Sequence, residues 1–270
     1  MGVKQALRGL LIDLDGTLYH GGIMIPGADE FIQSLREQEL GYLYVTNNST
    51  ATPEVVAERL QAMGIPASAD EVCTSAQGAA AYIAQKQPNA RVYVIGETGL
   101  RAALEAAGLQ LVEDEPDIVV QGIDRQLTYD KLAKAVQFIR SGAQYILTNP
   151  DLLLPSDHGL IPGAGSISAL LRTASGVTPT VIGKPSSILM DFALQRMGLD
   201  AEEAWVIGDN PATDIAAGQA AGCKSILVLT GLATGDNYKK LLAAANCEAD
   251  VIIHDLYQLK QYIHEQQARS

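Results

Sequence analysis

The chain has 270 residues, of which 47% are hydrophobic and 19% are charged, so it can bury a large core as one big domain or two ordinary ones. Its 19 Lys and Arg residues against 31 Asp and Glu residues give a net charge of -12, which repels nucleic acid and anionic lipid surfaces. Cys73, Cys223 and Cys247 lie far apart, without the spacing of a disulfide framework or a zinc site. No apolar run approaches the roughly 18 residues of a membrane span. We expect a cytoplasmic protein whose partners are neither nucleic acid nor membrane.

Nine short apolar runs are predicted to be β-strands. They cover residues 9–14, 42–47, 92–96, 117–122, 145–149, 179–183, 204–209, 225–229 and 250–254. Longer segments with a helical pattern lie between them, and several stop at a glycine, for example Gly64, Gly108 and Gly142. These predicted helices cover residues 27–38, 53–63, 76–86, 98–107, 128–141, 164–175, 186–197 and 211–221.

This alternation of strands and helices is typical of βαβ units that build a parallel sheet. Nine strands are many for a single sheet, and no long linker or low-complexity tract divides the chain. We therefore expect a second domain that is inserted into the first and not appended to it.

The first predicted strand runs straight into two aspartates, in the sequence GLLIDLDGTLY at residues 9–19. Residues two apart on a strand point to the same side, so Asp13 and Asp15 would crowd two negative charges together, and that crowding requires a cation. Gly16 lets the backbone turn away and lets a ligand approach. An ordinary Asp-Gly turn would explain Asp15 and Gly16 but not Asp13, so this strand end is a candidate ligand site.

A second apolar strand ends in carboxylates in the sequence AWVIGDNPATDI, where Asp209 follows Gly208 and Asp214 comes five residues later. Mg²⁺ prefers oxygen ligands and usually takes one or two carboxylates plus a substrate phosphate. That preference suits Asp13 and Asp209 if they converge from neighbouring strands. Taken alone, the segment is also compatible with an aspartate that caps a helix.

Two further strand ends carry polar residues. The strand in YLYVTNNST ends in Thr46, Asn47 and Asn48, which offer a hydroxyl and backbone N–H groups near a helix start, although such a segment is more often a capped polar turn. The strand in PTVIGKPS ends before Lys184, which in isolation would be read as a solvated lysine. Because Pro185 stands where a P-loop requires Ser or Thr, a P-loop kinase is disfavoured.

Together and in this order, the four segments resemble the haloacid dehalogenase superfamily of phosphatases. The sequence D13-L-D-G-T-L resembles the first motif of that family, Thr46 the second, Lys184 the third and G-D209-N-P-A-T-D214 the fourth. The phrases TNNST, IPGA, VIGKPS and GDNPATDI resemble its NagD-like or p-nitrophenyl phosphatase-like branch (class IIA). That branch carries a large α/β cap between the second and third motifs.

The resemblance implies a fold and a domain division. The fold is an α/β fold whose Rossmann-like core, a doubly wound parallel sheet, would comprise residues 1–78 and 178–270. The inserted α/β cap domain would comprise residues 79–177. Members of this branch are often dimeric through the cap, so a homodimer is possible.

The resemblance also implies how the acidic residues act. Asp13 would attack phosphorus to form an aspartyl phosphate, and Asp15 would protonate the leaving oxygen and later activate water. Mg²⁺ would be held by the side chains of Asp13 and Asp209 and by the backbone carbonyl of Asp15. Asp214 and Asn210 would lie behind these groups, with Asp214 orienting Lys184 or a metal-bound water.

The remaining predicted groups bind substrate. By resemblance, Thr46 and the Asn47 amide would hold phosphate oxygens, while Lys184 would neutralise charge on the nucleophile and the phosphoryl group. Polar loops at residues 121–130 and 148–159 follow predicted strands of the cap, which is where a leaving group would be met. The candidate cap contacts in these loops are Asp124, Asn149 and Asp151.

The predicted activity is magnesium-dependent hydrolysis of small phosphomonoesters, with a small phosphorylated metabolite as the partner. Sugar phosphates, nucleoside monophosphates, phosphoglycolate and pyridoxal phosphate stay open as substrates, with p-nitrophenyl phosphate as an artificial one. A receiver-type signalling module would be about half this length and lacks a counterpart of Asp15, and a metal-free dehalogenase requires neither Asp15 nor Asp209. A phosphomutase or phosphotransferase on the same scaffold, and a non-catalytic sensor of phosphorylated metabolites, remain alternatives.

Overall fold

The computed structural model describes residues 7–156 and 159–268 of the chain. Its internal contacts divide these residues into two compact units, which we describe separately. The first unit comprises residues 7–46, 54–73 and 184–268. The second unit comprises residues 47–53, 74–156 and 159–183.

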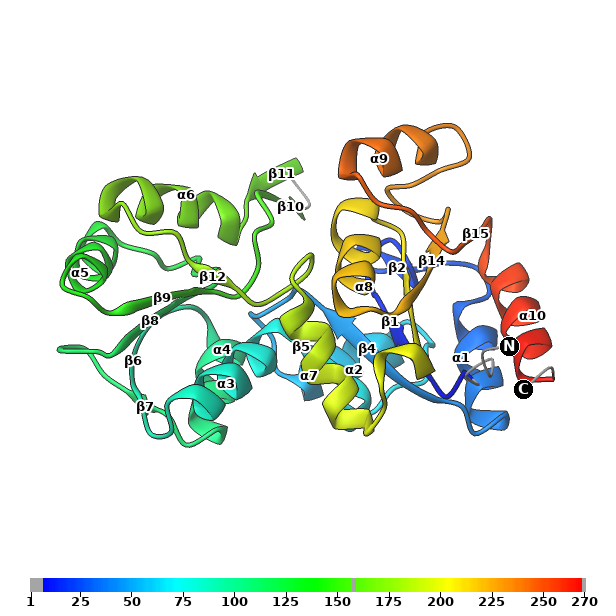
Figure 1. Cartoon of the computed structure of the whole chain (residues 1–270), viewed down its shortest axis with the longest axis horizontal. Coiled ribbons are helices and arrows are strands. Elements are labelled where there is room, and N and C mark those ends of the chain that lie inside the picture. The colour runs from blue at the N-terminus through cyan, green and yellow to red at the C-terminus, as the bar shows by residue number, and fades with distance from the viewer. Residues whose placement is uncertain (1–6, 157–158, 269–270) are drawn as a thin grey trace. The chain divides into compact units, whose positions relative to one another are not determined.

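A six-stranded sheet, in the order β15-β14-β13-β1-β4-β5, forms the centre of the first unit (Figure 1). Its strands are β1 (Gly9–Ile12), β4 (Gly41–Thr46), β5 (Val72–Thr74), β13 (Ala204–Gly208), β14 (Lys224–Val228) and β15 (Val251–Ile253). β1 is parallel to both of its neighbours, and Ile12 lies opposite Ile207 on one side and Tyr44 on the other. The carboxyl ends of β13, β1 and β4 therefore meet at one edge of the sheet.

Helices of the first unit pack in pairs. α1 (Ala28–Glu37) packs with α10 (Leu256–Gln267), and α7 (Ser187–Met197) packs with α8 (Ala216–Ala221). The core beneath α7 contains Leu11 and Leu43 from the sheet together with Leu189 from the helix, all buried. The unit also contains α2 (Pro53–Ala62), α9 (Tyr238–Ala245), the 3₁₀ turns Ala69–Glu71 and Ala201–Glu203, the π-helical turn Pro211–Ile215 and the small hairpin β2 (Tyr19–His20) with β3 (Ile23–Met24).

The second unit is built on a five-stranded parallel sheet in the order β12-β9-β8-β6-β7. Its strands are β6 (Arg91–Ile95), β7 (Gln110–Leu111), β8 (Ile118–Gln121), β9 (Gln144–Leu147) and β12 (Thr180–Val181). Two pairs of helices pack within this unit, and Figure 1 shows them on opposite faces of its sheet. They are α3 (Ser75–Lys86) with α4 (Thr98–Ala106), and α5 (Tyr129–Arg140) with α6 (Ala164–Ser175). A hairpin of β10 (Leu153–Ser156) and β11 (Gly159–Pro162) completes the unit.

The predicted α/β fold with parallel sheets is confirmed, and each of the nine predicted strands is present. The predictions did not include the helices α9 and α10 or several short strands. Strands of two to four residues show too little alternation to be recognised. One helix was predicted wrongly in detail: the segment 211–221 begins as a π-helical turn at Pro211–Ile215 and becomes α-helical only at Ala216.

The predicted cap, residues 79–177, falls inside the second unit, which also contains residues 47–53, 74–78 and 178–183. Its function as a cap stays a prediction. In the described part of the chain, none of the helices has the length and apolar character needed to cross a membrane.

Candidate active site

Asp13 and Asp15 lie on a tight turn at the end of β1. The Asp13 N–H donates to the Ile207 carbonyl at 2.9 Å, so the ladder between β1 and β13 continues through Asp13. Gly16 has a φ of 85°, and a Cβ atom at this position would lie 2.3 Å from Asp209 Oδ2. Only glycine therefore allows the turn to pass so close to the second predicted metal ligand.

Asp209 and Asp214 belong to the segment that follows β13. The side chain of Asn210 accepts a hydrogen bond from the Ala212 N–H at 3.0 Å and caps the π-helical turn. The backbone N–H of Asn210 donates to Asp214 Oδ2 at 3.1 Å. Asn210 thus stabilises the turn that presents Asp214, and its supporting role in the site stays a prediction.

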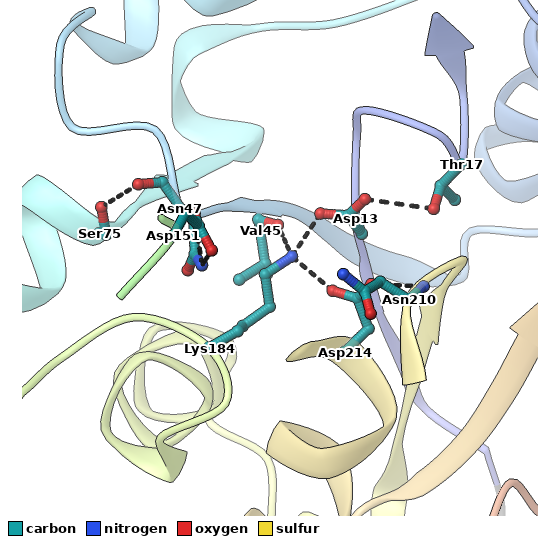
Figure 2. A network of polar contacts seen from close by, with 9 residues as sticks. All are labelled: Asp13, Thr17, Val45, Asn47, Ser75, Asp151, Lys184, Asn210 and Asp214. Atoms are coloured by element: carbon teal, nitrogen blue, oxygen red, sulfur yellow. Dashed lines mark hydrogen bonds and ion pairs between the residues drawn. The ribbon is translucent and has the colours of Figure 1, made fainter. Parts of the chain in front are cut away.

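The ammonium group of Lys184 contacts the end of β1, the end of β4 and the π-helical turn after β13, as Figure 2 shows. Its Nζ forms an ion pair with Asp13 Oδ1, lies 2.6 Å from Asp214 Oδ1 and donates to the Val45 carbonyl at 3.2 Å. The side chain is only 3% exposed. Burial alone would lower the pKa of Lys184, but the charges of Asp13 and Asp214 outweigh burial and raise this pKa above its ordinary value, so the lysine is charged.

The pKa values of Asp13 and Asp209 are raised by burial and by the charge of Asp214. Burial, followed by the charge of Asp214, raises the pKa of Asp13 well above its ordinary value. The same two causes raise the pKa of Asp209 to about 7. Both shifts show that the protein atoms alone do not balance the negative charge at this edge of the sheet.

Asp13, Asp209 and Asp214 could hold a metal ion, because one carboxylate oxygen from each lies within 4.8 Å of the others. Three carboxylates and one lysine leave two negative charges when all four groups are ionised, which a divalent cation would balance. Phosphatases of the haloacid dehalogenase superfamily generally use Mg²⁺, whose preference for oxygen ligands fits this set. Both Asp214 oxygens already contact protein groups, namely the Lys184 ammonium and the Asn210 N–H, which favours Asp13 and Asp209 as the direct ligands.

Asp15 has a different environment. Its side chain is exposed, yet the surrounding protein atoms raise its pKa, and the charges of His20 and Arg59 offset only part of this increase. A carboxyl group with a raised pKa and access to solvent has the properties of a general acid that must exchange protons with water.

The predicted phosphate-binding residues lie at the end of β4 and beyond it. Thr46 is the last residue of this strand and follows Val45, whose carbonyl accepts from Lys184. Asn47 begins the second unit, where its Nδ2 donates to Asp151 Oδ2 at 3.2 Å. Its carbonyl accepts from Asn149 Nδ2 at 2.8 Å, so Asn47, Asn149 and Asp151 form one cluster of the second unit (Figure 2 draws Asn47 and Asp151).

Asp124, the third predicted cap contact, belongs to a separate ion pair. Its Oδ2 accepts from Lys131 Nζ at 2.7 Å, and its Oδ1 accepts from the Gln126 N–H at 2.8 Å. The side chain is 4% exposed. These contacts connect the loop after β8 to the first turn of α5 and favour a structural role for Asp124.

The sequence predicted no role for three residues that contact predicted site residues of their own unit. Thr17 donates through Oγ1 to Asp13 Oδ2 at 3.2 Å, and Ser75 donates through Oγ to the Asn47 carbonyl at 2.6 Å. The Leu232 N–H donates to Asp209 Oδ2 at 2.5 Å. Thr17 could have been found, because it stands inside the first motif, whereas Ser75 and Leu232 carry no local signal.

Comparison with known proteins shows the family of this chain. The family profile described as haloacid dehalogenase-like hydrolase matches residues 10–110, and a HAD-hydrolase-like profile matches residues 181–259. The chain is 47% identical over 228 residues to 5'-nucleotidase YutF of Bacillus subtilis, covering 84% of this chain and 89% of that one. It is also 47% identical over 228 residues to the acid sugar phosphatase of Staphylococcus aureus, covering 84% and 88%.

A solved structure extends the agreement to the whole fold. The p-nitrophenyl phosphatase from Archaeoglobus fulgidus superimposes with a TM-score of 0.90 at 35% identity, covering 95% of this chain and 99% of that one. These similarities are consistent with the NagD-like branch inferred from the motifs. The chain therefore belongs to the haloacid dehalogenase-like hydrolase family.

Proposed function

We propose that this protein is a magnesium-dependent phosphatase that hydrolyses small phosphomonoesters through an aspartyl phosphate on Asp13. The observation that carries the proposal is the buried Lys184, whose ammonium group contacts both Asp13 and Asp214. A carboxylate oxygen of Asp209 lies within 4.8 Å of one from each of these aspartates, close enough for all three to bind one metal ion. A cationic lysine beside a carboxylate at the end of a parallel strand provides both a nucleophile and a counter-charge for a phosphoryl group.

The reaction would have two steps, phosphoryl transfer to Asp13 and hydrolysis of the aspartyl phosphate. A carboxylate oxygen of Asp13 forms a bond to phosphorus while the bond from phosphorus to the ester oxygen breaks, and Asp15 donates its proton to that departing oxygen. Asp15, now ionised, then takes a proton from water, whose oxygen bonds to phosphorus while the bond to Asp13 breaks. The products are an alcohol and orthophosphate.

The other residues would offset negative charge and keep the reacting groups in position during both steps. Lys184 would stay protonated and offset the negative charge of Asp13 and the phosphoryl oxygens, and Thr46 with the Asn47 amide would bind those oxygens. Asp214 keeps Lys184 in place through their ion pair. Mg²⁺, held by Asp13, Asp209 and the carbonyl of Asp15, would supply further charge compensation for the phosphoryl group.

The substrate class follows from the relatives. One similar protein is named a 5'-nucleotidase and another an acid sugar phosphatase, so we propose a nucleoside monophosphate or a sugar phosphate as the substrate. The cluster of Asn47, Asn149 and Asp151 is the part of the second unit that we propose to contact the substrate. The three cysteines are free and buried, which suits the reducing cytoplasm that we propose as its location.

The direct test is a panel of phosphomonoesters assayed for released phosphate with and without Mg²⁺. The panel contains nucleoside monophosphates, sugar phosphates, phosphoglycolate, pyridoxal phosphate and p-nitrophenyl phosphate. We expect magnesium-dependent release from p-nitrophenyl phosphate and from at least one of the first two classes.

Product analysis separates this proposal from the alternatives. Transfer of phosphate to a second hydroxyl group without release of orthophosphate would indicate a mutase or phosphotransferase. Binding of phosphorylated ligands without any turnover would indicate a sensor. Either result contradicts the proposal.

A further inference from the structure

A short segment after β14, residues Thr230–Ala233, lies against the two acidic loops of the first unit. The first loop is the turn Asp13–Gly16 after β1, and the second loop is the segment Asp209–Asp214 after β13. β14 ends at Val228, and the Leu229 N–H still continues the ladder by donating to the Ile253 carbonyl at 2.9 Å. The chain then leaves the sheet. Among its next four residues, Thr230 forms a hydrogen bond to the turn that carries Asp15, and Leu232 and Ala233 form hydrogen bonds to Asp209.

The contacts to the first loop come from Thr230. Its Oγ1 donates to the Gly16 carbonyl at 2.8 Å, so it is attached to the residue that follows Asp15. Its own carbonyl accepts from His20 Nε2 at 2.7 Å, which connects the segment to β2 as well. Thr230 therefore forms hydrogen bonds both to the turn after β1 and to β2.

The contacts to the second loop come from two backbone amides. The Leu232 N–H donates to Asp209 Oδ2 at 2.5 Å, and the Ala233 N–H donates to the Asp209 carbonyl at 3.1 Å. Among the described residues, no residue other than Asp209 itself donates a hydrogen bond to Asp209 Oδ1. The segment thus occupies one oxygen of the carboxylate and leaves the other for a cation.

Gly231 lies between these two sets of contacts and leaves no room for a side chain. A Cβ atom at this position would stand 2.1 Å from Asp209 Oδ2 and 2.5 Å from the Gly16 carbonyl oxygen. A carbonyl oxygen and a hydrogen-bonded carboxylate cannot yield as the end of a flexible side chain does. Any larger residue would therefore push the two acidic loops apart.

We infer that the Thr230–Ala233 segment is a positioning element for the metal site, because it sets the separation of the Asp13–Gly16 turn and Asp209 and selects the Asp209 oxygen that faces the cation. The inference rests on the proposed function in one respect, since it takes Asp209 as a metal ligand. Groups that orient metal ligands in this way typically change metal affinity by about 10- to 100-fold when they are lost.

The test measures metal binding directly on the full chain in the absence of substrate. Mn²⁺ is titrated by electron paramagnetic resonance, Mg²⁺ by the rise in melting temperature, and hydrolysis is assayed separately. Thr230→Val removes the hydroxyl donor at nearly constant shape, Thr230→Ser retains it, and Gly231→Ala introduces the Cβ atom. Thr234→Val is the matched control, because Thr234 is exposed, lies in the same loop and bonds through its backbone: its N–H donates to Asn237 Oδ1, and its carbonyl accepts from the N–H groups of Asn237 and Tyr238.

We expect the Kd for Mn²⁺ to rise about tenfold in Thr230→Val and about 100-fold in Gly231→Ala. Thr230→Ser and Thr234→Val should bind like the wild type. Saturating Mg²⁺ should restore most of kcat in Thr230→Val. If Gly231→Ala fails to fold, the comparison of the three threonine variants still decides the question.

Three outcomes would overturn the inference. The first is an equal Kd in Thr230→Val and Thr234→Val, and the second is a lower melting temperature of metal-free Thr230→Val with an unchanged Kd, which indicates a merely structural role. The third is a wild-type protein that binds neither ion. A wild type that binds metal but hydrolyses no phosphomonoester would reject the proposed function alone, and the Kd values would still test this inference.

Discussion

At the scale of single residues, the site depends on charges that are buried together. The ammonium group of Lys184, with a side chain only 3% exposed, contacts the carboxylates of Asp13 and Asp214, whose charges raise the pKa of the lysine and keep it protonated. Loss of one partner from such a set leaves an uncompensated buried charge. Substitutions here must therefore be judged for folding as well as for activity.

Asp13→Asn should remove hydrolysis while the fold persists. The amide keeps the size of the side chain but is not a nucleophile, so turnover of p-nitrophenyl phosphate should fall by about 10³-fold or more. Phosphate release and circular dichroism measure the two effects. Asp191→Asn is the control, because Asp191 is exposed and, within the described part of the chain, its side chain accepts a hydrogen bond only from Ser187 Oγ, at 2.9 Å. Retained turnover in Asp13→Asn would reject Asp13 as the nucleophile.

Asp15→Asn should affect substrates according to their leaving groups. An alkoxide leaving group needs a proton from Asp15, so hydrolysis of a sugar phosphate should fall by about 10²- to 10⁴-fold. p-Nitrophenolate departs without protonation, so formation of the phosphoenzyme from its ester should be much less affected. The rate constants of that first step, measured by rapid quenching, give the comparison. An equal loss for both esters would contradict the role of general acid.

At the scale of elements, a polar network joins α1, β4 and the 3₁₀ turn before β5. Arg36 donates to Tyr42 Oη at 2.9 Å and pairs with both carboxylate oxygens of Glu71, while Tyr42 Oη donates to Glu71 at 2.7 Å. Burial, together with the hydrogen bond to Glu71, raises the pKa of Tyr42 to about 12 and keeps the phenol protonated as a donor. The network fixes the amino-terminal half of β4, whose carboxyl end carries Thr46.

Tyr42→Phe should lower the free energy of unfolding by about 1 kcal/mol. The ring stays in place and only the hydroxyl group is lost, so hydrolysis should be unchanged. Urea denaturation of the variant and the wild type gives the difference. Tyr129→Phe should have no effect, because Tyr129 is 84% exposed. A stability of Tyr42→Phe equal to that of Tyr129→Phe would show that the network contributes nothing measurable.

At the scale of the whole molecule, the chain carries a net charge of -12 and gathers three carboxylates at one edge of a parallel sheet. A divalent cation that binds the folded chain and not the unfolded chain must stabilise the fold by linkage. The metal would therefore serve stability and catalysis through the same residues.

Removal of metal should lower both the melting temperature and the activity. A chelator should stop hydrolysis, and Mg²⁺ at about 100 times its Kd should restore it and stabilise the protein by about 2.7 kcal/mol. Thermal unfolding with and without Mg²⁺ measures the second effect. Asp209→Asn should lose most of this stabilisation. A melting temperature that does not respond to Mg²⁺ would argue against the metal site.

The sequence alone predicted the α/β fold, the nine main strands and the acidic residues that follow two of these strands. It could do so because each of these features is local: apolar runs such as 9–12 and 204–208 are strands by composition, and Asp13 and Asp209 follow them directly. The resemblance of four short motifs to one family was enough to predict roles for Thr46 and Lys184 as well. Parallel strands then bring these strand ends to one edge of the sheet.

Only the tertiary structure decided which side chains meet. The pairing of Lys184 with Asp214, the ion pair of Asp124 with Lys131 and the contact of Leu232 with Asp209 join residues from different elements. Such contacts leave no periodic pattern along the chain, because they depend on where the strands and loops come together after folding. For the same reason the sequence pointed to Asp124 as a substrate contact and gave no role to the Thr230–Ala233 segment.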